Sequence, residues 1–451
     1  MKCDNVSRVL TSGEDQHPGD VSSGSHSNDQ SHRQEMVLAI SQFYGSESAA
    51  VGKFLADAAT AIVSAGNRFR VICTKDTYRG LSHSGAEVAH SVTDKARNWR
   101  AIEVVRLANI QFSHTPTKRI LSYATFYLGA VWKAISGPRP DVVLTLTAPP
   151  GMAWIGWMLQ RMRGCRHVIW EMDLYPDIAV ALGIARAIHL KSILDYPRRR
   201  ADAVIALGEC MRERLISHGV SDKRIHVIEN WADQHKIYPR PFPPSSPLRI
   251  QYSGNFGLAH DLGTVQGAIE HLANDPTIAF EFIGGGPQRA QLEELCKTQQ
   301  IKNITFRGYV RDEKLCASLG EAHIGLITQK AATVGAVVPS KTYAVMAAGR
   351  PILYIGPARA TPARIIERFG CGWRIPCGDT DGLVKLLKYL AQHPEEIAEK
   401  GRRGREASVN YHDVETQVRK ICSALGLKRC TSSDDACEPE CAELSESCEA
   451  Q

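Results

Sequence analysis

A repeated alternation of short apolar runs with longer amphipathic runs limits the folds open to this chain more than any other feature. Residues 37–41 (VLAIS) and 69–73 (FRVIC) are typical of buried strands, and residues 49–65 between them have the pattern of a helix ending at Gly66. This order indicates two parallel strands joined by a crossover helix. The apolar runs show little polar alternation, as expected where helices cover both faces of a sheet. The sequence therefore predicts an α/β fold.

The alternation occurs in two halves, which a proline-rich stretch separates. Residues 237–248 (IYPRPFPPSSPL) hold five prolines, which exclude regular structure and favour a semi-rigid connector. Strands are also predicted at 102–107, 141–146, 167–170, 203–207 and 225–228, and in the second half at 248–252, 278–283, 303–307, 323–327, 351–355 and 372–376. Helices are predicted at 120–135, 151–162, 211–218, 262–272, 288–298, 312–319, 340–348, 362–369, 381–393 and 414–425. Two Rossmann-like domains follow, with parallel sheets, helices on both faces, and ligands at the carboxyl ends of the strands.

The predicted domains follow these patterns. They are a disordered N-terminal segment (1–35), an N-terminal domain (36–238), a linker (239–247), a C-terminal domain (248–410), a helix that we expect to pack back on the N-terminal domain (411–428), and an acidic disordered tail (429–451). Disorder is expected in the first segment because its polar composition cannot offset the entropy of ordering. Within the C-terminal domain, Thr380 is the predicted N-cap of the helix at 381–393.

The charge of the chain is unevenly distributed. The net charge is +6, but the stretch from Thr431 onward holds seven acids and no Lys or Arg, which leaves +13 on the remainder. Such a basic body suits nucleotide phosphates, lipid phosphates or an anionic membrane face, and equally a solvated surface. The thirteen cysteines lack metal-site spacing, and we find neither a secretory signal nor an uninterrupted apolar run of membrane-spanning length. We expect a cytoplasmic protein with no metal and no nucleic-acid partner, and a peripheral location on the inner face of the membrane is the alternative.

Three glycines follow a predicted buried strand in the motif FIGGGP, residues 282–287. Gly284, Gly285 and Gly286 allow the backbone to approach a ligand closely, and the following helix offers N–H groups to a phosphate. A tight strand-to-helix turn is an equally good interpretation. No GxGxxG motif is present, which argues against a dinucleotide redox cofactor.

Two other segments of the second half place polar side chains at predicted strand ends. In YSGNFGLAHD (252–261), a loop carries Asn255 and His260, and the histidine either donates to a phosphate or is a surface polar group. In VVPSKTYAVMAAGRPIL (337–353), Ser340 and Lys341 begin a predicted helix. Helix N–H dipoles and the lysine charge would bind an anion there.

The first half carries two acids and an aromatic–proline turn directly after a predicted strand, in EMDLYPD (171–177). Asp173 is the candidate catalytic residue because active sites collect at the carboxyl ends of parallel strands. The alternative is that Asp173 or Asp177 caps the next helix.

Together these motifs resemble the GT-B glycosyltransferases, and among them the retaining glycosyltransferase family 4, from about Val37 to Leu425. The most specific segments are SGNFGLAHDL, FIGGGP, FRGYV, VVPSKTYAVMAAGRPILYIGP and RADAVIALGECMRERLISHGV with the following IENWAD. EMDLYPD is similar to members that assemble capsule, O-antigen and colanic acid. The resemblance implies two facing Rossmann-like domains, a nucleotide sugar in the C-terminal one, an acceptor in the N-terminal one, no metal requirement and retention of configuration.

The resemblance also implies roles for individual residues. Near the base and ribose it places Gly284, Gly285, Gly286, Val310 and Arg311, and around the donor diphosphate it places Gly254, Asn255, Ser340 and Lys341. Many members carry a Glu-x7-Glu pair, where this chain has Ala336 and Ala344. Many also carry an Arg and a Lys in the loop that here holds Asn255 and His260. Lys341 would then supply the positive charge, with His260 as a further donor-binding residue.

The sequence therefore predicts a metal-independent glycosyltransferase that needs no cofactor. It would move a sugar, with retention, from a nucleotide-diphosphate donor to a glycan or a polyprenyl-diphosphate-linked acceptor in cell-surface polysaccharide assembly. Two alternatives remain: a nucleotide-sugar epimerase of the same fold, and an inactive GT-B protein that binds a sugar nucleotide or a partner transferase. A peripheral membrane contact through 119–135 competes with an ordinary sheet-packing helix.

Overall fold

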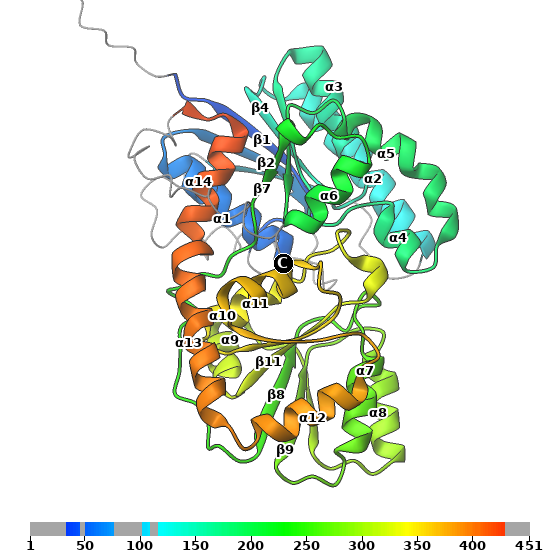
Figure 1. Cartoon of the computed structure of the whole chain (residues 1–451). Coiled ribbons are helices and arrows are strands. Elements are labelled where there is room, and N and C mark those ends of the chain that lie inside the picture. The colour runs from blue at the N-terminus through cyan, green and yellow to red at the C-terminus, as the bar shows by residue number, and fades with distance from the viewer. Residues whose placement is uncertain (1–32, 46–49, 76–101, 109–115, 429–451) are drawn as a thin grey trace, which may run out of the picture. The chain divides into compact units, whose positions relative to one another are not determined.

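The computed structural model of the chain describes residues 33–45, 50–75, 102–108 and 116–428 (Figure 1). The strands of the first sheet are β1 (Met36–Ile40), β2 (Arg68–Thr74), β3 (Ile102–Leu107), β4 (Val142–Leu146), β5 (Arg166–Trp170), β6 (Ala203–Ala206) and β7 (Ile225–Val227). They run parallel in the order β3-β2-β1-β4-β5-β6-β7. The predicted acidic tail at 429–451, and all but the end of the predicted disordered segment 1–35, lie outside the described residues.

The second sheet has six parallel strands. They are β8 (Leu248–Ser253), β9 (Ile278–Ile283), β10 (Ile304–Arg307), β11 (Ile324–Thr328), β12 (Ile352–Ile355) and β13 (Gly372–Ile375), in the order β10-β9-β8-β11-β12-β13. In both sheets the strand order reverses beside the first strand, so polar loops from neighbouring strands meet at the carboxyl edge, where ligands bind in such folds.

Helices cover both faces of the first sheet. They are α1 (Ala50–Ser64), α2 (Pro116–Ser136), α3 (Ala153–Arg163), α4 (Asp177–Ala181), α5 (Lys191–Arg198) and α6 (Glu209–Ser217), with 3-10 turns η2 (Ala185–Leu190) and η3 (Asp222–Arg224). Apolar side chains of α1 and α6 join the core on one face, and those of α2 and α3 join the core on the other.

The second sheet is covered in the same way. Its helices are α7 (Gly263–His271), α8 (Arg289–Thr298), α9 (Asp312–Gly320), α10 (Lys341–Ala347), α11 (Thr361–Phe369), α12 (Thr380–Leu390) and α13 (Pro394–Tyr411), with the 3-10 turn η4 (Ala331–Thr333). One core holds side chains of α7, α8 and α12, and the opposite core holds those of α10, α11 and α13. The predicted α/β architecture of parallel sheets with helices on both faces is confirmed.

A final helix, α14 (Val414–Leu425), packs on the first sheet. Val418, Ile421 and Leu425 are buried in the same core as β5 and β6, and Figure 1 shows α14 beside α1. The Arg166 guanidinium donates to the carbonyl of Ala424 at 3.2 Å. The last helix of the chain therefore stabilises the fold of the first sheet through both apolar burial and a backbone contact.

Some sequence-based expectations need correction. The segment between β5 and β6 forms α4, η2 and α5, and α13 spans residues for which no helix was predicted. The N-cap of α12 is Asp379, whose carboxylate accepts from the Gly382 N–H, so the assignment of Thr380 as N-cap was wrong. Aspartate is the better cap because its carboxylate accepts from the first N–H groups at the positive end of the helix dipole.

Across the described ranges, we find no helix with the length and apolar character needed to cross a bilayer.

Candidate functional site

The glycine loops that follow β8 and β9 lie against each other. Gly254, Gly284 and Gly286 have φ values of 144°, 125° and 141°, which favour glycine. A Cβ on Gly284 would lie 2.0 Å from the carbonyl oxygen of Gly254, and one on Gly286 would lie 2.7 Å from the Phe256 nitrogen. These glycines are therefore required for packing, as the turn interpretation predicts.

The same loops retain N–H groups that could bind a ligand. The Gly254 N–H donates to the Ile283 carbonyl, and the Phe256 N–H donates to the Gly285 carbonyl, both at 2.8 Å. Within the part of the chain that the structure describes, the N–H groups of three intervening residues donate to no protein acceptor: Asn255, Gly285 and Gly286. Such a group of backbone donors is suited to phosphate oxygens.

Lys341 places a buried amine beside these loops. Its Nζ lies 3.7 Å from the centre of the Tyr252 ring and 2.9 Å from the position that a Cβ on Gly254 would take. Among the described residues this amine has no hydrogen-bond partner, although the residue as a whole is partly exposed. Burial lowers the pKa of Lys341 to about 7 from its ordinary value of 10.5. A bound anion would restore the stabilisation that burial removes from the ammonium.

The helix that begins at this lysine is short. α10 contains seven residues, and Ser340, which precedes it, has helical dihedral angles and makes no capping hydrogen bond. The helix dipole predicted from sequence is therefore a small contribution at this position. The charge of Lys341 and the loop N–H groups are the stronger candidates for anion binding.

His260 has a tautomer that does not suit the phosphate donation predicted from sequence. Its Nδ1 donates to the carbonyl of Thr328 at 2.8 Å, because a carbonyl can only accept. Burial lowers the pKa of His260 to about 3, and the positive charge of Lys341 contributes in the same direction. The ring is therefore neutral near pH 7, with Nε2 as an acceptor. A hydroxyl is a better partner for this nitrogen than a phosphate.

Val310 and Arg311 lie in the turn between β10 and α9. Val310 is half-buried and Arg311, the N-cap residue of α9, is exposed. The neighbouring Tyr309 was missed by sequence reasoning, although it lies within the FRGYV motif. Its hydroxyl donates to the Gly285 carbonyl at 3.2 Å, which brings this turn against the glycine loop.

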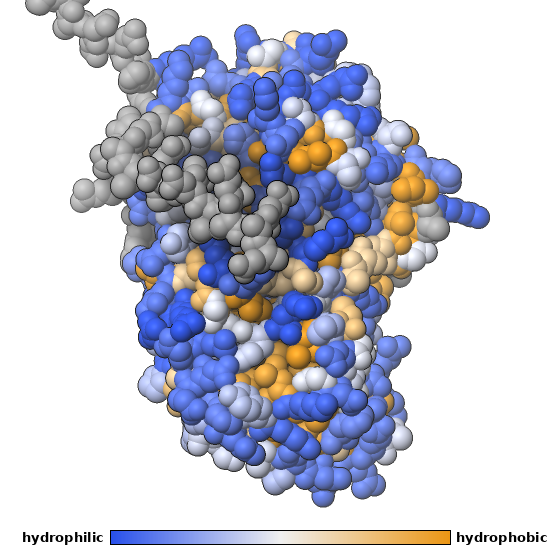
Figure 2. Space-filling view, viewed as in Figure 1, coloured by the Kyte–Doolittle hydropathy of each residue, from blue (hydrophilic) through white to orange (hydrophobic). Residues whose placement is uncertain are grey.

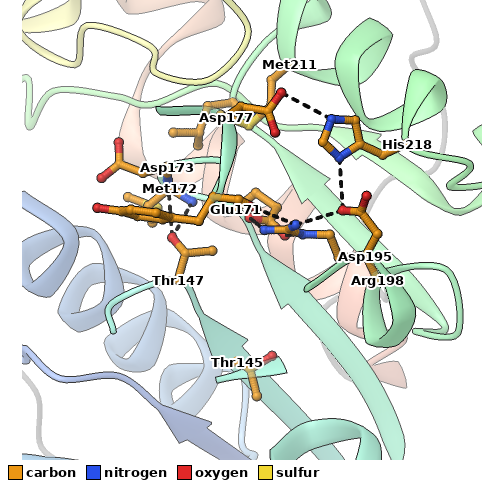
Figure 3. Close-up of polar contacts among 12 residues, drawn as sticks. Thr145, Thr147, Glu171, Met172, Asp173, Asp177, Asp195, Arg198, Met211 and His218 are labelled. Atoms are coloured by element: carbon orange, nitrogen blue, oxygen red, sulfur yellow. Dashed lines mark hydrogen bonds and ion pairs between the residues drawn. The ribbon is translucent and has the colours of Figure 1, made fainter. Parts of the chain in front are cut away.

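Asp173 lies three residues beyond the end of β5, at the carboxyl edge of the first sheet. Its N–H donates to the Thr147 hydroxyl at 3.2 Å, and Figure 3 shows its carboxylate pointing away from the neighbouring charged residues. Burial and, to a smaller extent, the negative charge of Glu171 together raise the pKa of Asp173 to about 6. No capping hydrogen bond from Asp173 or Asp177 is found at the start of α4, where Pro176 is the N-cap residue.

The Asp173 loop is paired with the segment that leads to Lys341. Asp173 and Val337 form an isolated antiparallel bridge, and the Leu174 N–H donates to the Ala336 carbonyl at 2.8 Å. Ala336 is fully buried in the core of the first sheet, and Ala344 is half-buried in α10. The positions where many family 4 members carry glutamates are therefore held by small packing residues.

Comparison with protein families identifies the chain. Residues 50–231 match the glycosyl transferase 4-like domain, and residues 265–423 match a glycosyl transferase-like domain. The chain is a family 4-like GT-B glycosyltransferase.

Two relatives agree with this assignment, and one solved structure shares the fold. The glycosyltransferase is 27% identical to the probable glycosyltransferase WbjE of Pseudomonas aeruginosa over 269 residues, which cover 56% of this chain and 67% of WbjE. It is 24% identical to the putative colanic acid biosynthesis glycosyl transferase WcaI of Escherichia coli K12, with 74% of this chain and 86% of WcaI covered. The structure of Anabaena Alr3699/HepE in complex with UDP-glucose shares the fold of this glycosyltransferase, with a TM-score of 0.63, 14% identity, and coverage of 87% of this chain and 99% of HepE.

No cluster of three His, Cys, Asp or Glu side chains that could hold a metal ion occurs among the residues that the structure describes.

Proposed function

We propose that this glycosyltransferase transfers a sugar from a nucleotide-diphosphate donor to a glycan or a polyprenyl-diphosphate-linked acceptor, with retention of configuration, in cell-surface polysaccharide assembly. The name of WcaI supports the pathway, and the UDP-glucose bound to HepE supports the class of donor. The reaction would need neither a metal nor a cofactor.

The buried amine of Lys341 is the observation that carries this proposal. An unpaired amine is costly inside a protein unless a ligand satisfies it. Here it lies beside Gly254, next to a loop that presents free N–H groups at Asn255 and Gly285. A positive charge and a group of N–H donors together match the two phosphates of a donor. In this proposal Ser340 adds a hydroxyl at the diphosphate, and the turn at Val310 and Arg311 contacts the base and ribose.

The proposed chemistry follows from these contacts. The bond between the anomeric carbon and the β-phosphate oxygen breaks, and the acceptor hydroxyl oxygen bonds to the same face of the sugar. The hydroxyl proton passes to the leaving phosphate oxygen. Lys341 and the loop N–H groups would stabilise the negative charge that develops on this oxygen. Asp173, ionised above about pH 6, would accept a hydrogen bond from the acceptor and orient it.

A screen of nucleotide sugars tests the donor assignment. Binding of a true donor raises the melting temperature, because a ligand that binds the folded state stabilises it. Lys341→Met should reduce this stabilisation and lower turnover at least about tenfold with the donor at saturation. Lys302→Met, at an exposed position, is the control and should behave as the wild type. Unchanged turnover in Lys341→Met at saturating donor would refute the role of Lys341.

The product of the reaction separates the candidate activities. Transfer to a polyprenyl-diphosphate sugar, with the anomeric configuration of the product determined by NMR, would establish a retaining transferase. Conversion of the donor into its epimer without an acceptor would instead establish an epimerase, and binding without turnover would establish an inactive protein.

We also propose that α2 contributes to a peripheral membrane contact. One stripe of α2 packs on the sheet through Phe126, Ala130 and Ala134, which are buried. The opposite stripe exposes Leu128 and Trp132, which are 74% and 68% accessible. The helix therefore packs on the sheet, as the plainer interpretation predicts, and still presents an apolar face to solvent.

Other exposed apolar residues and several cations favour a lipid surface as the partner. Figure 2 shows hydrophobic residues gathered at the surface beside α4 and α5, where four large apolar side chains are exposed: Ile184, Ile188, Leu190 and Ile193. Exposed basic residues of α2 are Lys118, Arg119 and Lys133. Apolar side chains next to basic ones are typical of proteins that bind anionic membranes.

Flotation with liposomes tests this contact. We expect binding to vesicles that contain anionic lipid, and at least a severalfold loss of bound protein in Leu128→Ser combined with Trp132→Ser. Tyr389→Ser, which alters an exposed aromatic residue on α12, is the control. Absence of binding to neutral and anionic vesicles alike would remove the membrane contact.

A further inference from the structure

A chain of buried charged groups lies behind the loop that carries Asp173 (Figure 3). Arg198 donates to Glu171 at 2.6 Å, to Asp195 at 2.9 Å and to the backbone carbonyl of Tyr175 at 2.6 Å. The side chains of Arg198, Glu171 and Asp195 are at most 5% exposed. Water therefore cannot replace these partners, and each charge depends on the others.

His218 extends this chain to a third carboxylate. Its Nδ1 lies 2.9 Å from Oδ1 of Asp195, and its Nε2 lies 3.2 Å from Oδ1 of Asp177. An ionised carboxylate can only accept hydrogen bonds, so both ring nitrogens must donate. A neutral imidazole has a single N–H and would leave one nitrogen lone pair facing a carboxylate oxygen. The geometry therefore requires an imidazolium at His218.

The groups next to the ring favour the same protonation state. Asp195 and Asp177 contact the two ring nitrogens, and they also contact Arg198 and Arg214, whose Nε lies 3.4 Å from Oδ1 of Asp177. Burial opposes the charge, but the hydrogen bonds and charges of Asp177 and Asp195 outweigh it, so the pKa of His218 is raised above 6.5. Burial likewise opposes ionisation of Asp177, yet its bond to His218 lowers the pKa of this carboxyl below 3.8.

Charged groups from several elements face His218 or its carboxylate partners. The carboxylates are Asp177 of α4, Asp195 of α5 and Glu171 of the loop after β5. The cations are Lys191 and Arg198 of α5, Arg214 of α6, and Arg199, which follows α5. The Arg199 guanidinium donates to the His218 carbonyl at 3.3 Å.

The network holds the loop of residues 171–177 at three points. These are the Glu171 carboxylate, the Tyr175 carbonyl and the Asp177 carboxylate. Asp173 lies between them, with its carboxylate directed away from the network and its backbone paired with Val337. A neutral ring keeps one N–H, which the shorter contact assigns to Asp195, so deprotonation would remove the hydrogen bond to Asp177 and leave this end of the loop to Arg214.

We propose that His218 is a positioning residue for sugar transfer, whose positive charge holds loop 171–177 so that Asp173 lies beside the segment leading to Lys341. The consequence for transfer rests on the proposed function, whereas the protonation of His218 and its hold on the loop do not. Turnover should fall at alkaline pH as His218 loses its proton. The KM for the donor should be the same in the wild type and in His218→Gln at any one pH, because His218 contacts none of the donor-binding candidates.

NMR of protein with 13C-labelled histidine tests the charge directly. We expect the His218 ring to titrate above pH 6.5, and the amide signals of Asp173 and Val337 to shift with the same midpoint. Asp177→Asn retains an oxygen that accepts from Nε2 but removes a charge, so it should lower this midpoint by about one pH unit. His271→Gln, on the exposed surface of α7, is the control and should change neither the His218 titration nor the amide shifts.

Kinetics test the positioning. His218→Gln should lower kcat about tenfold at pH 7, remove its alkaline decline and leave the donor KM within about twofold of the wild type. Asp177→Asn should move the alkaline decline to lower pH by the same amount as the ring titration.

The possible outcomes separate the role of His218 in holding the loop from the proposed sugar transfer. A His218 ring that titrates below pH 6.5, amide signals that ignore its titration, or an unchanged kcat profile in a folded His218→Gln protein would overturn the proposal. If His218→Gln does not fold, the NMR titrations of the wild type and of Asp177→Asn still test whether His218 is charged and holds the loop. Absence of transfer from every donor, with the amide signals following His218 as expected, would refute the proposed function and leave the hold of His218 on the loop established.

Discussion

The amine of Lys341 lies over the ring of Tyr252, 3.7 Å from its centre, while the hydroxyl of the same ring donates to the Asn255 carbonyl at 2.5 Å. Tyr252 thus fixes the glycine loop at one end and supports a buried positive charge on its face. A ring face attracts a cation by roughly 2 kcal/mol where water is excluded, which is less than the cost of burying an ammonium. The ring therefore holds the amine in place without giving it a hydrogen-bond acceptor, and an anionic ligand can supply one.

Nucleotide diphosphates should bind Lys341 with uptake of a proton at alkaline pH. Burial holds the pKa of Lys341 at about 7 in the free protein, and the negative phosphates of a ligand would raise it. The affinity for UDP should therefore be highest below pH 7 and decrease as the pH rises through 7. Calorimetry at pH 8 in buffers of different ionisation enthalpy should report uptake of close to ~1 proton. Binding without proton uptake at this pH would contradict the prediction.

Tyr252→Leu should move the pH dependence of UDP binding to lower pH. Loss of the ring removes the favourable contact with the ammonium, so the pKa of Lys341 should fall by about one pH unit. Tyr252→Phe retains the ring and loses the hydroxyl bond to Asn255, so it controls for the effect on the loop. The two variants should differ in the midpoint of UDP affinity against pH. Identical midpoints would show that the ring does not stabilise the charge.

Gly284→Ala should destabilise the protein by at least about 2 kcal/mol. The residue has a φ of 125°, and its new Cβ would lie 2.0 Å from the carbonyl oxygen of Gly254, which cannot move away as a flexible side chain could. Gly308→Ala is the matched control, because no atom lies within 4 Å of its Cβ position. Chemical denaturation of both variants gives the comparison. Equal stability of the two would mean that the glycine loops are packed less closely than described.

Asp173→Asn should lower transfer at least about tenfold while UDP binding stays unchanged, since Asp173 is proposed to orient the acceptor. Because the pKa of Asp173 is raised to about 6, wild-type transfer should rise with pH through 6, and this rise should disappear in the variant. The folded state holds this proton more tightly than the unfolded chain, so the contribution of Asp173 to stability falls from pH 3.8 to 6. Asp381→Asn, at an exposed position, is the control and should leave transfer, UDP binding and the pH dependence of transfer unchanged.

Much of the fold could be predicted because local patterns dictate it. The strand from Ile102 to Leu107 and the helix from Val414 to Leu425 have the bounds that their apolar patterns indicate. Prediction failed between β5 and β6, where α5 contains Pro197 and has buried charged residues on its inner face. Apolar periodicity cannot detect a helix that is anchored by Arg198 and Asp195, since its buried positions are polar in sequence.

The candidate site was predicted in part. The positions of Lys341, Gly254 and Gly284 at the carboxyl edge of the second sheet follow from the order of strands and loops. The neutral ring of His260 did not follow, because it depends on the Thr328 carbonyl, which lies on another strand.

Spacing and residue type along the chain are sufficient to indicate the two parallel sheets, the glycines at their loops and the similarity to GT-B glycosyltransferases. The burial of the Lys341 amine on the Tyr252 ring and the bridge from His218 to Asp177 and Asp195 could be found only in the folded chain. The charge state of a side chain depends on which segments exclude water from it and which charges they bring near. Those segments are distant in sequence, and only folding brings them together.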